Sequence, residues 1–146
     1  MAAIQQSVLG LLQSAQTAAL FTTHTAQQRQ QIQEQVKENI PHIEEEIEKR
    51  GQTIKQMQSN VASLKAEAAE RSAAQQEHYE ATGEILSDEF LEGIRDPATG
   101  ETIQPSAYEQ IRATEASIDK EELALARAQE RLEGQYKKLK KYGGKL

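Results

Sequence analysis

The chain of 146 residues contains no cysteine and no tryptophan, and it has only three prolines. Without cysteine, disulfides, thiol catalysis and zinc sites built on thiolates are excluded. Aromatic residues make up 4% and charged residues 27%, which favours long exposed helices over a thick globular core. Paired helices bury only one stripe each, so we expect full ordering to require a partner or further copies.

Signatures of catalysis and of cofactor or metal binding are also missing. The sequence has no glycine-rich phosphate loop, no Walker sequence and no Gly-x-Ser-x-Gly. His42 and His78 lack the glutamate three residues earlier that a carboxylate-bridged metal bundle uses, and we interpret them, with His24, as surface residues. We therefore expect no catalytic, cofactor-binding or metal-binding residues and no enzymatic activity.

Charge is distributed unevenly around a net value of −6. Residues 1–28 carry no charged side chain, and residues 83–105 hold one basic and six acidic residues. Residues 106–146 reverse the balance, with nine basic against seven acidic. The chain thus combines an acidic middle with a basic C-terminal end.

Two stretches have the apolar spacing of a coiled coil. A heptad seam covers residues 36–78, and a second one repeats an aliphatic residue every seven positions. The sequence therefore predicts a mainly all-α protein, a long antiparallel coiled-coil hairpin, although a seam does not exclude pairing between two chains. The first seam consists of Val36, Ile40, Ile43, Ile47, Arg50, Ile54, Met57, Val61, Leu64, Ala68, Arg71, Gln75 and His78, and the second of Ile111, Ile118, Leu125, Leu132 and Leu139.

Two regions are expected. Residues 1–35 form an N-terminal amphipathic helix and a glutamine-rich connection, and residues 36–146 form the hairpin. We place its helices at 41–82 and 106–142. Pro41 is expected to kink or restart the first helix, and a kink is favoured over a full reversal of the chain because no glycine or polar loop lies around it. Ser106 to Glu109 fits a capping box at the start of the second helix.

The insert at residues 83–105 is expected to hold a short helix and a small β-hairpin. Asp96-Pro97-Ala98-Thr99-Gly100 is a turn sequence, because proline presets φ and glycine accepts a positive φ. Ser87 is a candidate cap for the short helix. Matching the two seams by length predicts layers such as Ile47 with Leu139 and Val61 with Leu125, separated by Arg50–Tyr136, Met57–Gln129, Leu64–Glu122 and Arg71–Glu115.

The N-terminal segment offers a candidate docking surface. Glutamines interrupt its apolar residues, so a membrane span is not expected, and no basic region precedes it as in a secretory signal. It either packs within its own helical bundle or docks into a larger assembly. The residues that we assign to docking are Ile4, Val8, Leu11, Leu12, Leu20 and Phe21.

A lysine cluster near the C-terminus is the second candidate surface: Lys137, Lys138, Lys140 and Lys141. Lysines there can simply complement the helix dipole and keep the end soluble. They can also contact an anionic polymer such as nucleic acid, a lipid surface or an acidic protein surface.

The opening residues, Met1-Ala2-Ala3-Ile4-Gln5-Gln6-Ser7-Val8 followed by Leu11-Leu12, resemble those of small virion-associated proteins of crAss-like and related gut bacteriophages. That resemblance implies a structural component of a phage particle, such as a neck, ring or internal cargo protein, located in the virion; otherwise we expect a cytoplasmic protein. The expected partners are further protein subunits or further copies. In outline the hairpin is also similar to prefoldin subunits, although the charge-free N-terminal helix departs from them, and this implies a holdase chaperone as an alternative. A nucleic-acid-binding accessory protein is the other alternative.

Overall fold

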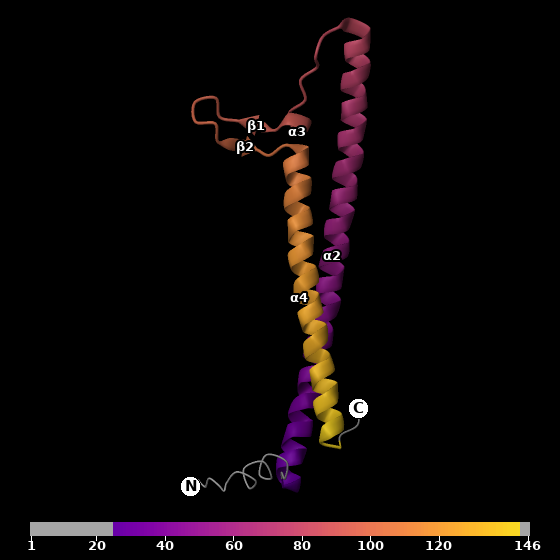
Figure 1. Ribbon diagram of the computed structural model, residues 1–146, viewed down its shortest axis with the longest axis vertical. Coiled ribbons are helices and arrows are strands. Elements are labelled where there is room, and N and C mark those ends of the chain that lie inside the picture. Colours follow the sequence, from indigo (N-terminus) through magenta and orange to yellow (C-terminus); the bar gives the residue numbers. More distant parts are fainter. Residues whose placement is uncertain (1–24, 144–146) are drawn as a thin grey trace, which may run out of the picture. The chain divides into compact units, whose positions relative to one another are not determined.

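A computed structural model describes residues 25–143 (Figure 1). Its elements follow the order α2 (Ala26–Thr82), α3 (Glu89–Glu92), β1 (Ile94–Arg95), β2 (Thr102–Gln104) and α4 (Ala107–Lys141). The two long helices pack against each other within one chain, which confirms the coiled-coil hairpin and its small β insert. The expected N-terminal amphipathic helix lies outside the described residues. Among residues 25–143, no helix is both long enough and apolar enough to cross a membrane.

Helix α2 begins at Ala26, so the expected start at Pro41 is wrong. The cause is a capping box: the Thr25 hydroxyl accepts a hydrogen bond from the backbone N–H of Gln28 (3.1 Å), and the Gln28 side chain accepts one from the N–H of Thr25 (2.9 Å). Residues 26–35, expected as a connection, therefore form the first turns of the helix.

Pro41 lies inside helix α2. Because proline has no backbone N–H, the carbonyl of Lys37 loses its helical donor. Both residues are on the exposed face, where water can satisfy that carbonyl. Neither a restart nor a reversal occurs at this position.

The chain divides into two units, and the first consists of residues 1–44 and 130–146. Its described core is formed by Val36, Ile40 and Leu139, with Ile32, Leu132 and Tyr136 packed against them. Polar pairs border this core: Asn39 donates to Gln135 (3.3 Å), and the Tyr136 hydroxyl donates to Glu44 (3.1 Å). Burial and the Glu44 carboxylate together raise the pKa of Tyr136.

The second unit, residues 45–129, contains the central helical turns and the β insert. Its buried side chains are Ile54, Val61, Ala107 and Ala128. Ion pairs join the helices from Arg50 to Glu121 (2.6 Å) and from Lys65 to Glu115 (3.5 Å). From the first pair to the second, the residue number rises on α2, from 50 to 65, and falls on α4, from 121 to 115. The helices are therefore antiparallel.

The seam predicted for α2 is confirmed almost residue by residue. Every seam residue from Val36 to His78 is buried or half-buried except Arg71, whose side chain is 44% exposed and contacts Asp88 of the insert. In α4 the five aliphatic positions also face inward. The residues predicted to lie between these aliphatic positions are wrong: Glu115, Glu122 and Gln129 are exposed. The inward-facing residues between the aliphatic positions are instead Thr114, Glu121, Ala128 and Gln135.

The predicted register is wrong as well. Leu139 packs on Val36 and Ile40, roughly two to three helical turns from the expected Ile47. Two features cause the shift. Helix α2 offers additional apolar residues before Pro41, and the chain after Thr82 doubles back beside α2 instead of spanning directly to α4, as Gln75 to Leu86 (2.7 Å) and Arg71 to Asp88 (3.2 Å) show.

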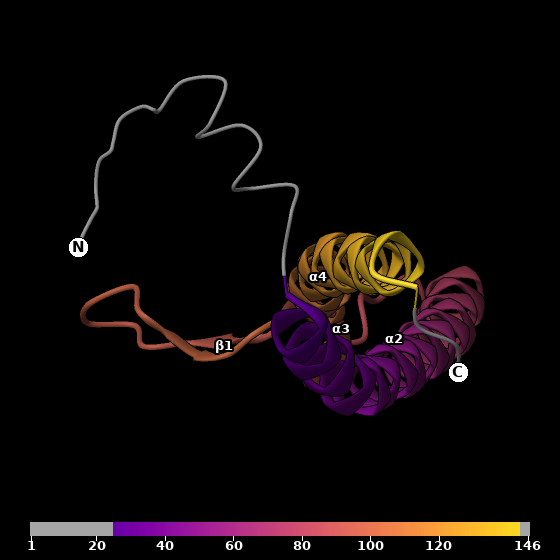
Figure 2. The same cartoon turned by 90° about the horizontal axis from the view of Figure 1, so that it is seen from below.

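The β-hairpin in the insert is confirmed. Ile94 pairs with Gln104 and Arg95 with Thr102, antiparallel. Its turn closes as the sequence predicts: the Asp96 carboxylate accepts from the N–H of Ala98 (2.8 Å), and the N–H of Gly100 donates to the carbonyl of Asp96 (2.7 Å). In two perpendicular views the hairpin projects sideways from the start of α4 (Figures 1 and 2).

The capping box of α4 is also present. The Ser106 N–H donates to Glu109 (2.9 Å), and the Glu109 N–H donates to the Ser106 hydroxyl (3.1 Å). Hydrogen bonds from Ser106, followed by the Arg95 guanidinium at 3.0 Å, lower the pKa of Glu109. Arg95 thereby ties the hairpin to the first turn of α4.

Gly93 should tolerate no side chain. It has φ of 77°, and a Cβ atom there would lie 2.7 Å from both the Gln104 carbonyl oxygen and the Ser106 nitrogen. We expect Gly93→Ala to loosen the insert, seen as faster amide hydrogen exchange in residues 88–106, while the long helices keep their helical circular dichroism.

Gly51 is the matched control for Gly93. It is helical, and a Cβ atom there would meet nothing within 4 Å. Gly51→Ala should raise the free energy of unfolding by about 0.5–1 kcal/mol, because alanine loses less backbone entropy in a helix. Unchanged exchange in the insert of Gly93→Ala would contradict the close approach described here.

Candidate protein-docking surface

Helix α2 ends in a turn that sends the chain back along the helix. Gly83, with φ of 74°, follows the last helical residue, and its N–H donates to the carbonyl of Tyr79 (2.7 Å). The Gln75 side chain then donates to the carbonyl of Leu86 (2.7 Å), and Arg71 reaches Asp88. Residues 84–88 are thereby held beside the last turns of α2.

This return of the chain creates an apolar groove. The tip groove, as we call it, is lined by Ser72, Gln75, Gln76, Tyr79, Ile85 and Leu86. Its three large apolar side chains are open to solvent: Ile85 is 83% exposed, Tyr79 52% and Leu86 44%. Exposed apolar side chains gathered in one place are typical of a binding surface, whereas single ones are common on any protein.

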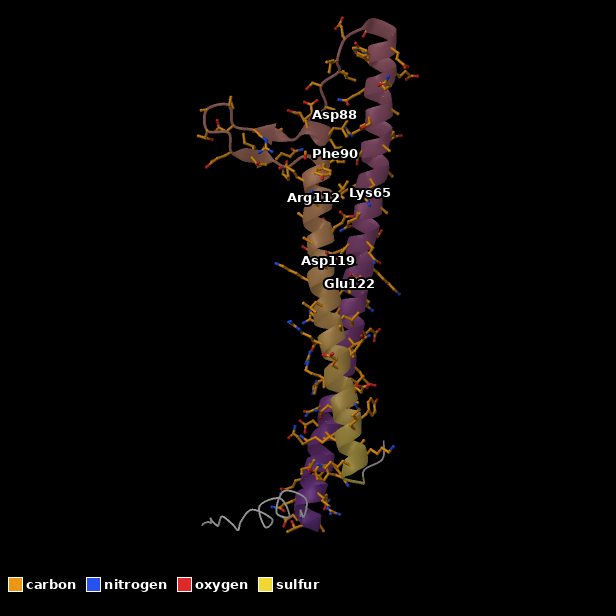
Figure 3. The ribbon with its side chains drawn as sticks, in the orientation of Figure 1. Lys65, Asp88, Phe90, Arg112, Asp119 and Glu122 are labelled. Carbon is orange, nitrogen blue, oxygen red and sulfur yellow. The ribbon has the colours of Figure 1, made fainter. Side chains whose placement is uncertain are left out.

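Asp88 connects the insert to α2. Its carboxylate caps α3 by accepting from the N–H groups of Phe90 (2.9 Å) and Leu91 (3.2 Å). The guanidinium of Arg71 binds the same carboxylate and lies 4.9 Å from the centre of the Phe90 ring. Figure 3 shows Asp88 and Phe90 on the α3 side that faces α2.

The pKa of Asp88 reflects these contacts. Partial burial by itself would raise the pKa, but the N–H groups of Leu91 and Phe90 and the Arg71 guanidinium outweigh it, and the pKa is lowered. The folded insert therefore prefers the ionised carboxylate. Its stabilising effect is fully present above the pKa of an unfolded aspartate, and it is lost as the pH falls through the lowered value.

We expect Arg71→Gln to raise the pKa of Asp88 towards the ordinary aspartate value. A carboxyl NMR titration of Asp88 measures it. Arg112→Gln is the control, because Arg112 contacts Tyr108 (2.9 Å) instead. An Asp88 pKa that is equal in the Arg71 variant and the wild type would show that the ion pair has no role.

Acidic side chains surround the tip groove. We define the tip as residues 67–109; it contains eleven acidic and two basic residues. Both basic residues are already paired, Arg71 with Glu67 and Asp88, and Arg95 with Glu109. The tip therefore presents carboxylates without compensating cations, next to exposed apolar groups.

The two docking surfaces expected from the sequence have different outcomes. Ile4, Val8, Leu11, Leu12, Leu20 and Phe21 lie outside the described residues. Lys137, Lys138, Lys140 and Lys141 are exposed in the last turns of α4. Lys137 pairs with Glu133 (3.5 Å), with both side chains largely exposed, and Lys141 lies over the Tyr142 ring.

Metal-binding side chains do not converge in the part of the chain that is described. Residues 25–143 contain no group of three histidine, aspartate or glutamate side chains able to hold an ion. His42 is exposed and His78 half-buried. The described structure thus adds no candidate metal site to those considered from the sequence.

The tip groove was missed at the level of sequence. Its signal was present: Ile85 and Leu86 directly follow the helix-ending Gly83, outside both seams and outside the hairpin. The heptad pattern could not place them, because it describes only the helices. Their position depends on the long-range hydrogen bond between Gln75 and Leu86.

Comparison with protein-family models, with curated proteins and with solved structures gives no match to this chain.

Proposed function

We propose that this chain is a non-enzymatic structural protein that joins other protein subunits in an assembly. The observation that carries the proposal is the tip groove, an exposed apolar surface with acidic surroundings at the turn of a coiled-coil hairpin. The tip lies within the unit of residues 45–129, and its exposed apolar side chains offer an area that a partner can cover.

The resemblance at the N-terminus supports a more specific version, in which the assembly is a bacteriophage particle. In that version the protein is a neck, ring or internal cargo component, and the charge-free segment of residues 1–24 inserts among neighbouring subunits. Its sequence supports insertion, because no charged side chain would have to leave water.

Photocrosslinking tests the role of the tip. A photoreactive amino acid at Ile85 should give one defined protein adduct in cells that make the whole assembly, identified by mass spectrometry. The same probe at Leu123, which is 53% exposed on α4 and does not line the groove, is the control. Equal adducts from both positions, or none from Ile85, would overturn the proposal.

Deleting residues 1–24 tests the N-terminal segment separately. The deletion retains Thr25 and therefore the cap of α2. We expect an unchanged melting temperature of the isolated chain and loss of incorporation into the assembly. A markedly lower melting temperature would instead show that the segment packs on its own hairpin.

A holdase chaperone is a second candidate, favoured by the same exposed residues, because Tyr79, Ile85 and Leu86 can also hold an unfolded client. It predicts that the purified protein suppresses aggregation of several unrelated unfolded proteins and that Ile85→Ser weakens this effect. A failure to protect any client would remove this candidate.

A further inference from the structure

We propose that the tip groove of one chain is occupied by the lysine-bearing end of α4 from a second copy, so that copies associate head to tail. This inference rests on the proposed function and names the partner of the tip. It follows from three observations: the segregation of charge, the unpaired state of the groups concerned, and the chemistry of the groove.

Charge is segregated between the two units. The unit of residues 45–129 has 18 acidic and 9 basic residues, a net charge of −9. The unit of residues 1–44 and 130–146 has 5 acidic and 8 basic residues, a net charge of +3. Two copies of the same chain can therefore bring opposite charges together, which favours encounter between unlike units.

The charges next to the groove are not neutralised internally. Glu84 precedes Ile85 in the segment of residues 84–88, and Glu80 follows Tyr79 in α2. Glu80 and Glu84 are both exposed. Glu80 accepts a hydrogen bond from Gln76 (3.2 Å), a neutral donor that lines the groove. Within residues 25–143, neither carboxylate has a cationic partner.

The C-terminal end of α4 with Lys137, Lys138, Lys140 and Lys141, called the lysine end, has more cations than are needed to complement the helix dipole. Lys138, Lys140 and Lys141 all fall in the last turn of α4. Complementing the dipole is a weak effect, about 0.3–1 kcal/mol per charge. Lys138 and Lys140 are exposed and, in the described part of the chain, make no ion pair.

Lysine also suits the apolar character of the groove. Its methylene stem can lie along apolar surface while the ammonium group remains at the polar edge. Stems placed over Tyr79, Ile85 and Leu86 would cover exposed apolar area, and the ammonium groups would reach Glu80 and Glu84. The open face of Tyr79 additionally accommodates a cation.

The contact joins unlike surfaces, so a pair of copies still has one free tip, on one copy, and one free lysine end, on the other. Such a heterologous contact builds a ring if the rotation closes and an open filament if it does not. Association should increase with protein concentration and weaken with salt. Sedimentation velocity of the full chain at about 0.01 M and about 1 M salt tests this, because screening lengths are about 30 Å and about 3 Å there.

Charge reversal identifies the two surfaces. The tip variant is Glu80→Lys with Glu84→Lys, and the end variant is Lys138→Glu with Lys140→Glu. Each alone should weaken self-association by at least about tenfold, because like charges then face each other. An equimolar mixture should restore association, since each tip again meets an end of opposite sign.

The control for net charge is Glu48→Lys with Glu122→Lys, two exposed positions outside the tip. It should associate like the wild type. Circular dichroism should be unchanged in all variants, because every substituted side chain is exposed. A mixture that remains monomeric, or a control as defective as the tip variant, would overturn the inference.

A nucleic acid partner for the lysines is the competing outcome. A labelled DNA duplex measured by fluorescence anisotropy tests it: binding lost in the end variant, together with a monomeric wild type, would overturn head-to-tail association. A monomeric wild type whose Ile85 probe still captures another protein would overturn this inference alone and leave the proposed function in place.

Discussion

The Ala128→Glu variant should lose at least about 3 kcal/mol of unfolding free energy, and its long helices should separate at low denaturant. Ala128 is fully buried on the inner face of α4. A glutamate there would have to bring a carboxylate out of water into a fully buried position between the helices. Urea unfolding followed by helical circular dichroism measures the loss.

The same substitution at neighbouring positions provides the controls. Ala126 and Gln129 are exposed, so Ala126→Glu and Gln129→Glu should each change stability by no more than about 0.5 kcal/mol. This comparison also decides between the two possible inner faces of α4. If Gln129→Glu is the damaging change, the layers predicted from the sequence are right and the observed ones are wrong.

Leu139→Ala should lower the free energy of unfolding by about 2–5 kcal/mol. Leu139 is 4% exposed and packs on Val36 and Ile40, so truncation both removes buried apolar surface and leaves a cavity. The loss should appear in thermal and urea unfolding alike.

Leu123→Ala is its matched control on the same helix. Leu123 is 53% exposed, and its truncation should cost no more than about 0.5 kcal/mol. Equal effects of the two substitutions would contradict the described core of Val36, Ile40 and Leu139.

The sequence was sufficient for the inner positions of α2, for the five aliphatic inner positions of α4 and for the local turns. Apolar residues repeated at heptad spacing can be buried on one helix face only, so the inner positions of α2 follow directly from the pattern. The hairpin turn at Asp96 and the capping box at Ser106 depend on residues within a few positions of each other. Both were therefore readable from the sequence and are present in the structure.

Contacts between residues far apart in the sequence, and with them the helix register, could not be predicted. Because heptads repeat, shifting α4 along α2 by a few turns again places apolar residues opposite apolar residues. Whether Leu139 packs on Ile47 or on Ile40 therefore depends on the path of the insert that joins the helices. That path depends on single contacts, such as Arg71 with Asp88. The sequence analysis also did not identify Ala107 and Ala128 as core residues, although both are buried more deeply than any leucine of α4.

The start of α2 shows a different kind of error. The helix was predicted to begin at Pro41, and the capping box at Thr25 and Gln28 was not identified from the sequence. An exposed proline within a long helix leaves only one carbonyl without its donor. Val36 and Ile40, which precede Pro41 in the same helix, pack on Leu139, so the turns before the proline have their own buried contacts.

The claim that the tip is the docking surface is tested most directly by amide hydrogen exchange of the free chain and of the chain in its assembly. Burial of the tip groove should slow exchange in residues 84–88, which border it. Exchange at the hairpin turn, residues 96–100, should be unchanged, since the turn does not line the groove. Unchanged exchange at residues 84–88 in the assembled protein would contradict this account.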